Sequence, residues 1–355
     1  MLDRQTRRLP TSYAEEARLF PVLHERWLAL SLVAAALFVL PQIGSDYLYS
    51  AVLVPVLVLG LAGLGQNLLT GFAGQLSVGS AAFMSVGAFA SYNFALRVEG
   101  LPLILSILLG GLCAALVGAL FGLPSLRIKG FYLIVSTLAA QFFVQWIFTK
   151  VTWFSNGSSS GVISAPPLRV FGRDLSTPSG RYLLTVSIVL GLTWMAKNLV
   201  RSNVGRSFMA VRDMDTAAAV IGIPLLRTKL LAFTISSFYL GVAGALWAFA
   251  YLGTVEPHGF DLNRSFQILF VAIIGGLGSV SGSYLGAAFV VLLPVALDQL
   301  QGLLFDGALS NGMLENVQKI IFGVLILLVL IKEPEGLTKL LLMLRNKLRH
   351  WPLPD

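Results

Sequence analysis

The sequence predicts an all-α integral membrane protein with about ten transmembrane helices, some of them interrupted by glycine-rich stretches. Apolar residues make up 56% of the 355 residues and charged residues only 12%, a balance that soluble globular domains do not have. The apolar residues gather into runs that approach the roughly 20 residues a spanning helix needs. One polytopic domain fits this length, and a separate soluble domain does not.

The expected spans follow one another along almost the whole chain. The first run and the eighth are short for a hydrocarbon core about 30 Å thick. Glycine-rich boundaries at 71–79 and 275–286 interrupt the apolar runs, and we expect broken or re-entrant helices there. The runs lie at about 27–41, 47–65, 81–96, 101–124, 131–149, 182–198, 230–252, 265–278, 282–300 and 316–331.

Lysine and arginine predict the orientation, because loops rich in these residues stay cytoplasmic. With the N-terminus inside, about 18 basic residues are cytoplasmic and about six lie outside, and the opposite orientation reverses that ratio. We therefore expect a cytoplasmic N-terminal segment 1–26, a polytopic domain 27–332 and a basic cytoplasmic tail 333–355. The net charge of +8 then reflects topology, and no nucleic-acid partner is needed to explain it.

No catalytic or metal site is visible in the sequence. A Gly-Lys pair is absent, so the chain lacks the phosphate-binding loop G-x-x-x-x-G-K-[ST] and cannot hydrolyse ATP by that route. The three histidines share no ligand spacing, and the single cysteine, Cys113, lies in an apolar run. Carboxylates near span centres are missing as well, which weakens a proton- or sodium-coupled carrier. These absences favour a permease driven by a separate motor, with no cofactor on this chain.

A basic segment at 199–229, the coupling segment, stands out within the apolar chain. Its helix-forming run 216–221 ends at Gly222, which predicts a short helix with Gly222 in the left-handed conformation. Asp213 and Asp215 stand where they could cap its first amides. Ala217 and Ala218 would present a small face to a cytoplasmic partner. The predicted coupling residues are Arg212, Asp213, Asp215, Thr216, Ala217, Ala218 and Gly222.

Two glycine-rich stretches are candidates for a substrate path: the first at 71–79 and the second at 274–282. Unwound backbone lines such paths in transporters built from broken helices. Close helix packing through small residues accounts for the same glycines equally well. Gln141 and Gln145 are further polar groups of interest, although helix contacts explain them more simply. The predicted path residues are Gly74, Gln75, Ser77, Gly275, Gly276 and Gly278.

Three strings carry a resemblance to a known family. They read GFAGQLSVGSAAFMSVGAFAS at 71–91, RTKLLAFTISSFYLGVAGALWA at 227–248 and IGGLGSVSGSYLGAAF at 274–289. They resemble LivM-type permease subunits of branched-chain amino acid ABC transporters, colinearly over most of 28–335. The run Thr216-Ala217-Ala218 with Gly222 resembles the coupling motif of ABC permeases, although Thr216 stands where the general motif has Glu.

The resemblance implies an inner-membrane subunit that is not itself an enzyme. Its implied partners are a second, LivH-like permease subunit, two ATP-binding cassette subunits that bind Mg-ATP, a periplasmic substrate-binding protein, a small-molecule substrate and membrane lipid. Relatives that carry urea, short amides or aromatic and other small acids leave the substrate open. An ATP-independent channel or carrier and a polytopic membrane enzyme are the rival classes.

Overall fold

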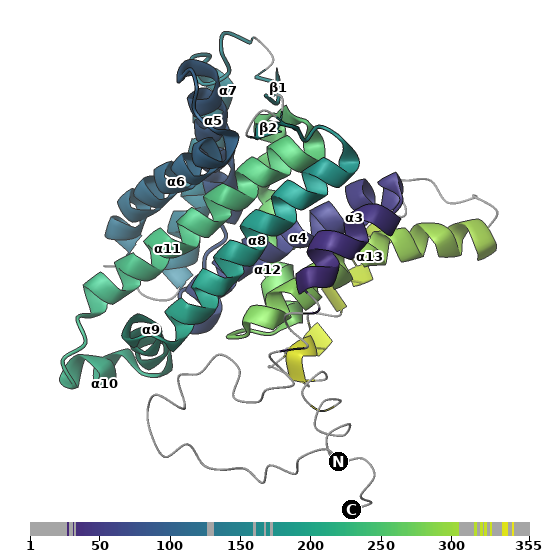
Figure 1. Ribbon diagram of the computed structural model, residues 1–355. Helices are drawn as coiled ribbons and strands as arrows, with labels where there is room; N and C mark the ends of the chain where they lie inside the picture. The colour runs from purple at the N-terminus through teal and green to yellow at the C-terminus, as the bar shows by residue number, and fades with distance from the viewer. Residues whose placement is uncertain are drawn as a thin grey trace, which may run out of the picture.

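The computed structural model describes residues 33–125, 131–158, 161–166, 168–170 and 173–304, together with isolated residues at 27 and 31 and between 316 and 343. These residues form a bundle of long helices (Figure 1). Several expected features lie wholly or largely outside the described residues: the segment 1–26, the loop with Arg127 and Lys129, the run 316–331 and the tail 333–355.

Most of the expected apolar runs form helices with bounds close to those predicted. The segments η2, α4 and η3 are continuous, and so are α11 and η4, with wider π-helical turns at η2, η3 and η4. In chain order the helices are η1 (Ala35–Val39), α3 (Leu40–Ile43), η2 (Leu48–Leu53), α4 (Val54–Asn67), η3 (Leu68–Phe72), α5 (Ser80–Arg97), α6 (Leu103–Ser125), α7 (Phe131–Lys150), α8 (Pro178–Arg201), α9 (Asn203–Asp213), α10 (Asp215–Val220), α11 (Leu225–Leu246), η4 (Trp247–Leu252), η5 (Pro257–Phe260), α12 (Leu262–Gly275) and α13 (Val280–Leu304).

The long helices make the chain a multi-pass membrane protein. Two expected runs form helices that do not meet the length and hydropathy of a span: α5, and α12, whose 14 residues reach only ~21 Å at about 1.5 Å per residue. The expectation of about ten spans is therefore not confirmed. In the described part of the chain, six helical segments are long and apolar enough to cross a membrane: Leu48–Phe72, Leu103–Leu123, Tyr132–Lys150, Pro178–Arg201, Leu225–Leu252 and Val280–Leu297.

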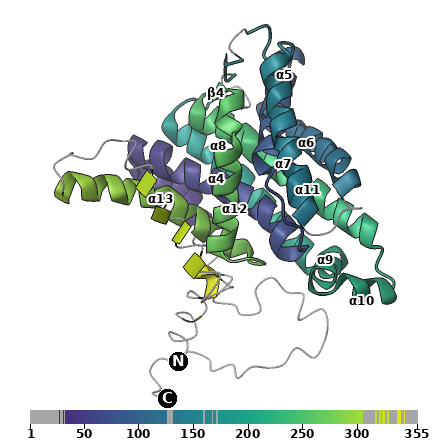
Figure 2. The ribbon, with the colours of Figure 1, turned by 180° about the vertical axis from the view of Figure 1, so that it is seen from behind.

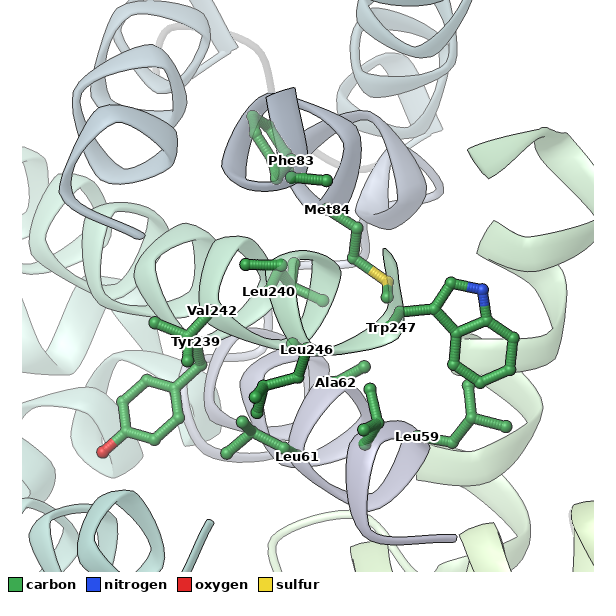
Figure 3. Packing of buried hydrophobic residues seen from close by; sticks show 14 of the residues in the cluster. Leu59, Leu61, Ala62, Phe83, Met84, Tyr239, Leu240, Val242, Leu246 and Trp247 are labelled. Atoms are coloured by element: carbon green, nitrogen blue, oxygen red, sulfur yellow. The ribbon is translucent and has the colours of Figure 1, made fainter. Parts of the chain in front are cut away.

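Helix α11 lies at the centre of the bundle, where it packs against α4, α5 and α6. Figure 3 shows α11 between Met84 of α5 and Ala62 of α4, with Leu246 of α11 on the side of α4. Small residues let these backbones approach closely, as is usual for helices in membranes: a Cβ added to Gly87 would lie 2.1 Å from the carbonyl oxygen of Gly241. Helix α4 also contacts α8, α12 and α13 (Figure 2), so it connects both sides of the bundle.

The two ends of the bundle carry different structures. At one end, β1 (Ile163–Ser164) pairs antiparallel with β4 (Thr254–Val255), and β2 (Arg169–Val170) pairs with β3 (Arg173–Asp174). These two-residue strands are a small departure from the all-α prediction. Helices α9 and α10 lie at the opposite end (Figure 1), so the coupling segment is remote from the loops that the sequence places outside.

Candidate functional site

Two adjacent amide side chains near the end of α4, Gln66 and Asn67, form the centre of the candidate site. Both residues are fully buried. Because successive residues of a helix point about 100° apart, the two amides face different neighbours. Gln66 turns toward the first glycine-rich stretch and Asn67 toward the second. Two adjacent residues of α4 therefore hold both glycine-rich stretches.

Gln66 holds the first stretch through its side-chain amide. Its Nε2 donates to the Ser77 carbonyl oxygen at 2.9 Å and to Thr70 Oγ1 at 2.9 Å. Its Oε1 accepts from the Ser80 hydroxyl at 2.6 Å. The Val78 backbone N–H donates to Thr137 Oγ1 of α7 at 3.1 Å. The non-helical residues that precede α5 thus find side-chain partners within the protein.

The N-terminus of α5 is capped by side chains from two other helices. The Ala81 N–H donates to Ser265 Oγ of α12 at 2.9 Å, and the Ala82 N–H donates to Gln141 Oε1 at 2.6 Å. Gln141 lies midway along α7, and its Nε2 donates to the Phe260 carbonyl oxygen at 2.8 Å. Helix α5 therefore begins inside the bundle. Irregular backbone at such a depth is tolerated only when it is satisfied by protein or lines a cavity.

Asn67 holds the turn between α12 and α13 in the second stretch. Its Nδ2 donates to the carbonyl oxygens of Gly276 at 3.2 Å and Ser279 at 2.9 Å. Its Oδ1 accepts from the Gly278 N–H at 2.8 Å. Gly276 and Gly278 have φ of 116° and 80°, in the region that favours glycine. A single side chain thus fixes a turn that needs glycine.

The two glycine-rich stretches touch each other beside Asn67. A Cβ added to Gly71 would lie 2.3 Å from the backbone nitrogen of Gly278 and 1.9 Å from Asn67 Oδ1. A side chain at this position would separate the stretches. The structure therefore unites, in one junction, two segments that are about 200 residues apart in the chain.

Arg212, near the end of α9, joins the coupling segment to this junction. Its guanidinium donates through Nη1 to the Gly71 carbonyl oxygen at 3.0 Å and through Nε to Asp213 Oδ1 at 2.8 Å. A Cβ added to Gly74 would lie 3.1 Å from the Arg212 Cα, and one added to Gly278 would lie 3.3 Å from its Nη1. Arg212 thus connects the predicted coupling residues to both glycine-rich stretches.

The short helix of the coupling segment ends as predicted. Helix α10 is followed by Gly222, whose φ is +89°. The Gly222 N–H donates to the Ala219 carbonyl oxygen at 3.0 Å and the Ile223 N–H to that of Ala218 at 3.0 Å, the pair of hydrogen bonds of a Schellman motif. The left-handed conformation of Gly222 is confirmed.

The known proteins that resemble this chain are transporter subunits. The family described as "Branched-chain amino acid transport system / permease component" matches residues 48–330. The chain belongs to this family. The high-affinity branched-chain amino acid permease protein LivM of Escherichia coli K12 is 30% identical over 74% of this chain and 72% of its own.

Other relatives show how far the resemblance reaches. The LivM protein of Salmonella typhimurium LT2 is 32% identical to this permease, and the match covers 65% of this chain and 59% of that relative. The fructose import permease protein FrcC of Rhizobium meliloti is 26% identical over 76% of both chains. No solved structure matches. The LivM-type resemblance of the permease is confirmed, while its relatives are named for more than one substrate.

The predicted cap of the short helix is wrong. The N-cap residue of α10 is Met214, which offers no side-chain acceptor. Asp213 is instead the last residue of α9, and its carboxylate pairs with Arg212 at 2.8 Å. Asp215 is the first helical residue and pairs with Lys229 at 3.7 Å. Neither carboxylate is at the N-cap position, because α9 includes Asp213 and α10 begins at Asp215, which leaves only Met214 between the two helices.

The predicted small docking face of the permease needs a similar correction. Ala218 is 2% exposed and packs inside the protein, whereas Ala217 is exposed. The large apolar side chains near this tip are the accessible ones: Met214 is 62% exposed, Val220 88% and Ile221 74%. Ala218 therefore faces the rest of the protein, and the outward surface is formed by the larger side chains at the two ends of α10.

The predicted path residues fall into two groups. Gly74 is exposed and Gln75 is half-buried, with its Nε2 donating to the Ala73 carbonyl oxygen at 3.3 Å. Ser77, Gly275 and Gly276 are buried, and Gly278 is half-buried. A Cβ on Gly275 would lie 2.0 Å from the Gly282 carbonyl oxygen, which favours close packing at that position. Their role in a substrate path stays a prediction.

Sequence reasoning missed Gln66 and Asn67, the residues that hold the junction together. Their signal was two adjacent amides within an apolar run, where an unsatisfied polar group is unfavourable. No group of three or more histidine, cysteine or acidic side chains in the described residues could hold a metal ion.

Proposed function

We propose that this permease component imports branched-chain amino acids across the inner membrane as part of an ATP-driven transporter. Its relatives named LivM support the substrate class. The missing phosphate-binding loop supports hydrolysis of ATP by separate subunits. We infer that the partners are two ATP-binding cassette subunits, a second, LivH-like permease subunit and a periplasmic binding protein.

The observation that carries this proposal is the contact of Arg212 with the junction. Its guanidinium bonds to Gly71 at the end of the first long span, and its stem lies against Gly74. A displacement of α9 would therefore reach the ends of the span at Leu48–Phe72 and of α12 without an intervening flexible loop. Packed elements of this kind transmit small shifts because they deform little.

The docking surface is proposed to be the apolar tip of the coupling segment. Val220 and Ile221 expose large apolar side chains next to the helix end, and Met214 does the same at its start. A neighbouring groove on an ATPase subunit would remove these side chains from water, which contributes about 25 cal/mol per Å² of buried apolar area. Arg206 and Arg227, both exposed, would surround this tip with positive charge.

The proposed sidedness follows from this docking. The coupling segment 199–229 and both termini are placed in the cytoplasm, with the loop that carries β1 and β2 outside. A single cysteine at Ser202 should then resist a membrane-impermeant thiol reagent in intact cells, after Cys113 is replaced by serine. Labelling from outside at Ser202 would reverse the orientation and remove the basis for cytoplasmic docking.

The transport proposal is tested with the chain reconstituted in proteoliposomes together with its partner subunits and binding protein. We expect uptake of radiolabelled L-leucine that requires ATP on the cytoplasmic side and does not follow a proton or sodium gradient. Fructose should not compete. Gradient-driven uptake without ATPase subunits would identify a secondary carrier, and fructose uptake would identify a sugar permease.

The docking surface is tested by a charge at its most exposed position. Val220→Glu should reduce co-purification of the ATPase subunits at least tenfold, because the charge would be desolvated at the interface. Asn203→Glu places the same charge on an exposed residue of α9 and should leave co-purification unchanged. Equal co-purification with both variants would remove α10 from the interface.

The transmission step is tested separately at Arg212. Arg212→Gln should keep the ATPase subunits bound, since the Arg212 guanidinium bonds to Gly71 within the protein, but should lower the leucine transported per ATP hydrolysed several-fold. Arg201→Gln, at an exposed arginine that ends α8, is the control. Unchanged stoichiometry in Arg212→Gln would show that its contact with Gly71 does not carry the coupling.

A further inference from the structure

A second arginine, Arg264, lies in the first turn of α12 and has no role in the junction described above. Its neighbour Ser265 bonds to Gln141, midway along α7. Arg264 is therefore level with the interior of the bundle, although it precedes the apolar run expected at 265–278. A guanidinium at this depth is unfavourable unless it is paired, and arginines in such positions commonly mark a functional pathway.

The guanidinium of Arg264 is only partly used by the protein. Its Nη1 donates to Gln267 Oε1, whereas its Nε is buried without a hydrogen-bond partner. No carboxylate of the described residues forms an ion pair with it. The nearby Asp261 accepts instead from the Arg264 backbone N–H at 3.0 Å and from Asn263 Nδ2 at 2.9 Å. Most of the five donors of this side chain thus stay available.

An aromatic wall fixes the plane of the guanidinium. The Arg264 Cζ lies 4.2 Å from the ring centroid of Trp247, within the range of a cation–π contact. Trp247 begins η4, a run of π-helical turns, which frequently occur at functional sites. Figure 3 shows its ring at the edge of the core cluster, beside Leu59. The ring of Tyr251, with its centroid 4.4 Å from that of Trp247, extends this wall.

We propose that Arg264, stacked on Trp247, binds the carboxylate of a small apolar acid inside the permease. A planar guanidinium held on a ring presents its N–H groups in a fork that fits a carboxylate, which a lysine cannot do. The flanking apolar and aromatic side chains suit an aliphatic tail. The site rests on the proposed transport of branched-chain amino acids, because it would engage their carboxylate during passage.

The first test uses the full wild-type chain in lipid nanodiscs with its partner permease. The probes are isovalerate and isovaleramide, which have the same shape and differ only in the carboxylate. We expect isovalerate to change the tryptophan emission with a half-saturation concentration at least tenfold lower than that of isovaleramide. The response should vanish in Trp247→Phe, which assigns it to the wall of the site.

Variants of Arg264 provide the second test. Arg264→Gln should raise the half-saturation for isovalerate at least tenfold, to that of the amide, and Arg264→Lys should recover only part of the loss. The matched control is Arg97→Gln, because Arg97 also stacks on a tryptophan, Trp153, at 3.6 Å. That variant should bind isovalerate as the wild type does.

The results separate this site from the proposed function. An equal response of the wild type to acid and amide, or unchanged isovalerate binding in Arg264→Gln, overturns the carboxylate site even if ATP-driven leucine uptake is observed. A carboxylate-selective response that depends on Arg264 supports the site even if leucine uptake is absent, and then only the proposed transport function falls.

Discussion

The two glycine-rich stretches look alike in sequence but are held in different surroundings. The end of the first stretch, residues 77–79, is enclosed by polar side chains from α4 and α7, and Ser77 and the following Ser80 are buried, whereas Gly74 and Leu76 before them are exposed. The second is a short turn held mainly by Asn67, with Leu277 and Ser281 exposed beside it. The end of the first stretch is thus an interior element, whereas the middle of the second lies at an exposed edge of the bundle.

This difference shows why glycine content alone does not identify a substrate path. At the buried end of the first stretch, irregular backbone needs several polar partners because no water compensates for lost hydrogen bonds. In the second, the turn needs positive φ at Gly276 and Gly278, and its exposed side tolerates polar groups that have no hydrogen-bond partner within the protein. We therefore expect the first stretch to dominate folding stability and the second to dominate movement of the coupling junction.

The largest effect is expected for Gln66→Leu, which removes the side chain of α4 that holds the end of the first stretch. The substitution leaves the Ser77 carbonyl and the Ser80 hydroxyl without Gln66, and each buried group left unpaired costs about 1–3 kcal/mol. Denaturant unfolding of the purified chain in mixed micelles measures the loss. Gln145→Leu, a half-buried glutamine of α7, is the control with the same change of side chain. Equal stability of the two variants would contradict the enclosed character of the first stretch.

A smaller loss of stability is expected for Asn67→Leu, which removes the side chain of α4 that holds the second stretch. Gly278 and Ser279 are only half-buried, so water can replace part of their lost hydrogen bonds, and the expected cost is about 1 kcal/mol. Transport should suffer more than folding, because the two stretches lose their common partner. The ratio of leucine uptake to folded protein in membranes measures this contrast with Gln66→Leu. A greater loss of stability in Asn67→Leu than in Gln66→Leu would reverse the comparison.

The smallest effect concerns how closely Arg212 fits each stretch. Gly74→Ala brings a Cβ within 3.0 Å of the Arg212 Cγ, near the root of the side chain, whereas Gly278→Ala meets Arg212 only at its flexible end, with Nη1 at 3.3 Å. Both substitutions add strain at positive φ, but only the first should interact with Arg212→Ala, by about 0.5–1 kcal/mol in a double-mutant cycle. Equal interaction energies at the two glycines would mean that Arg212 is fitted to both stretches alike.

Local features of the site were accessible from the sequence. The end of α10 at Gly222 was predicted correctly because a left-handed C′ glycine after a helix-forming run is a property of a few neighbouring residues. The cap was not, since the extent of α9 depends on its packing against α8 and α11. The burial of Ala218 likewise depends on how α10 packs against neighbouring helices.

The sequence by itself determined that this chain is a multi-pass helical membrane protein, where its main helices lie and which family it belongs to. These properties follow from composition, from runs of apolar residues and from short strings, all of which can be read along the chain. Only the tertiary structure decided that Gln66 and Asn67 join two distant interruptions, that Arg212 touches both, and that Arg264 is inside the bundle. Such contacts depend on how helices cross and rotate, because a side chain's partners lie on other helices, here up to 216 residues away.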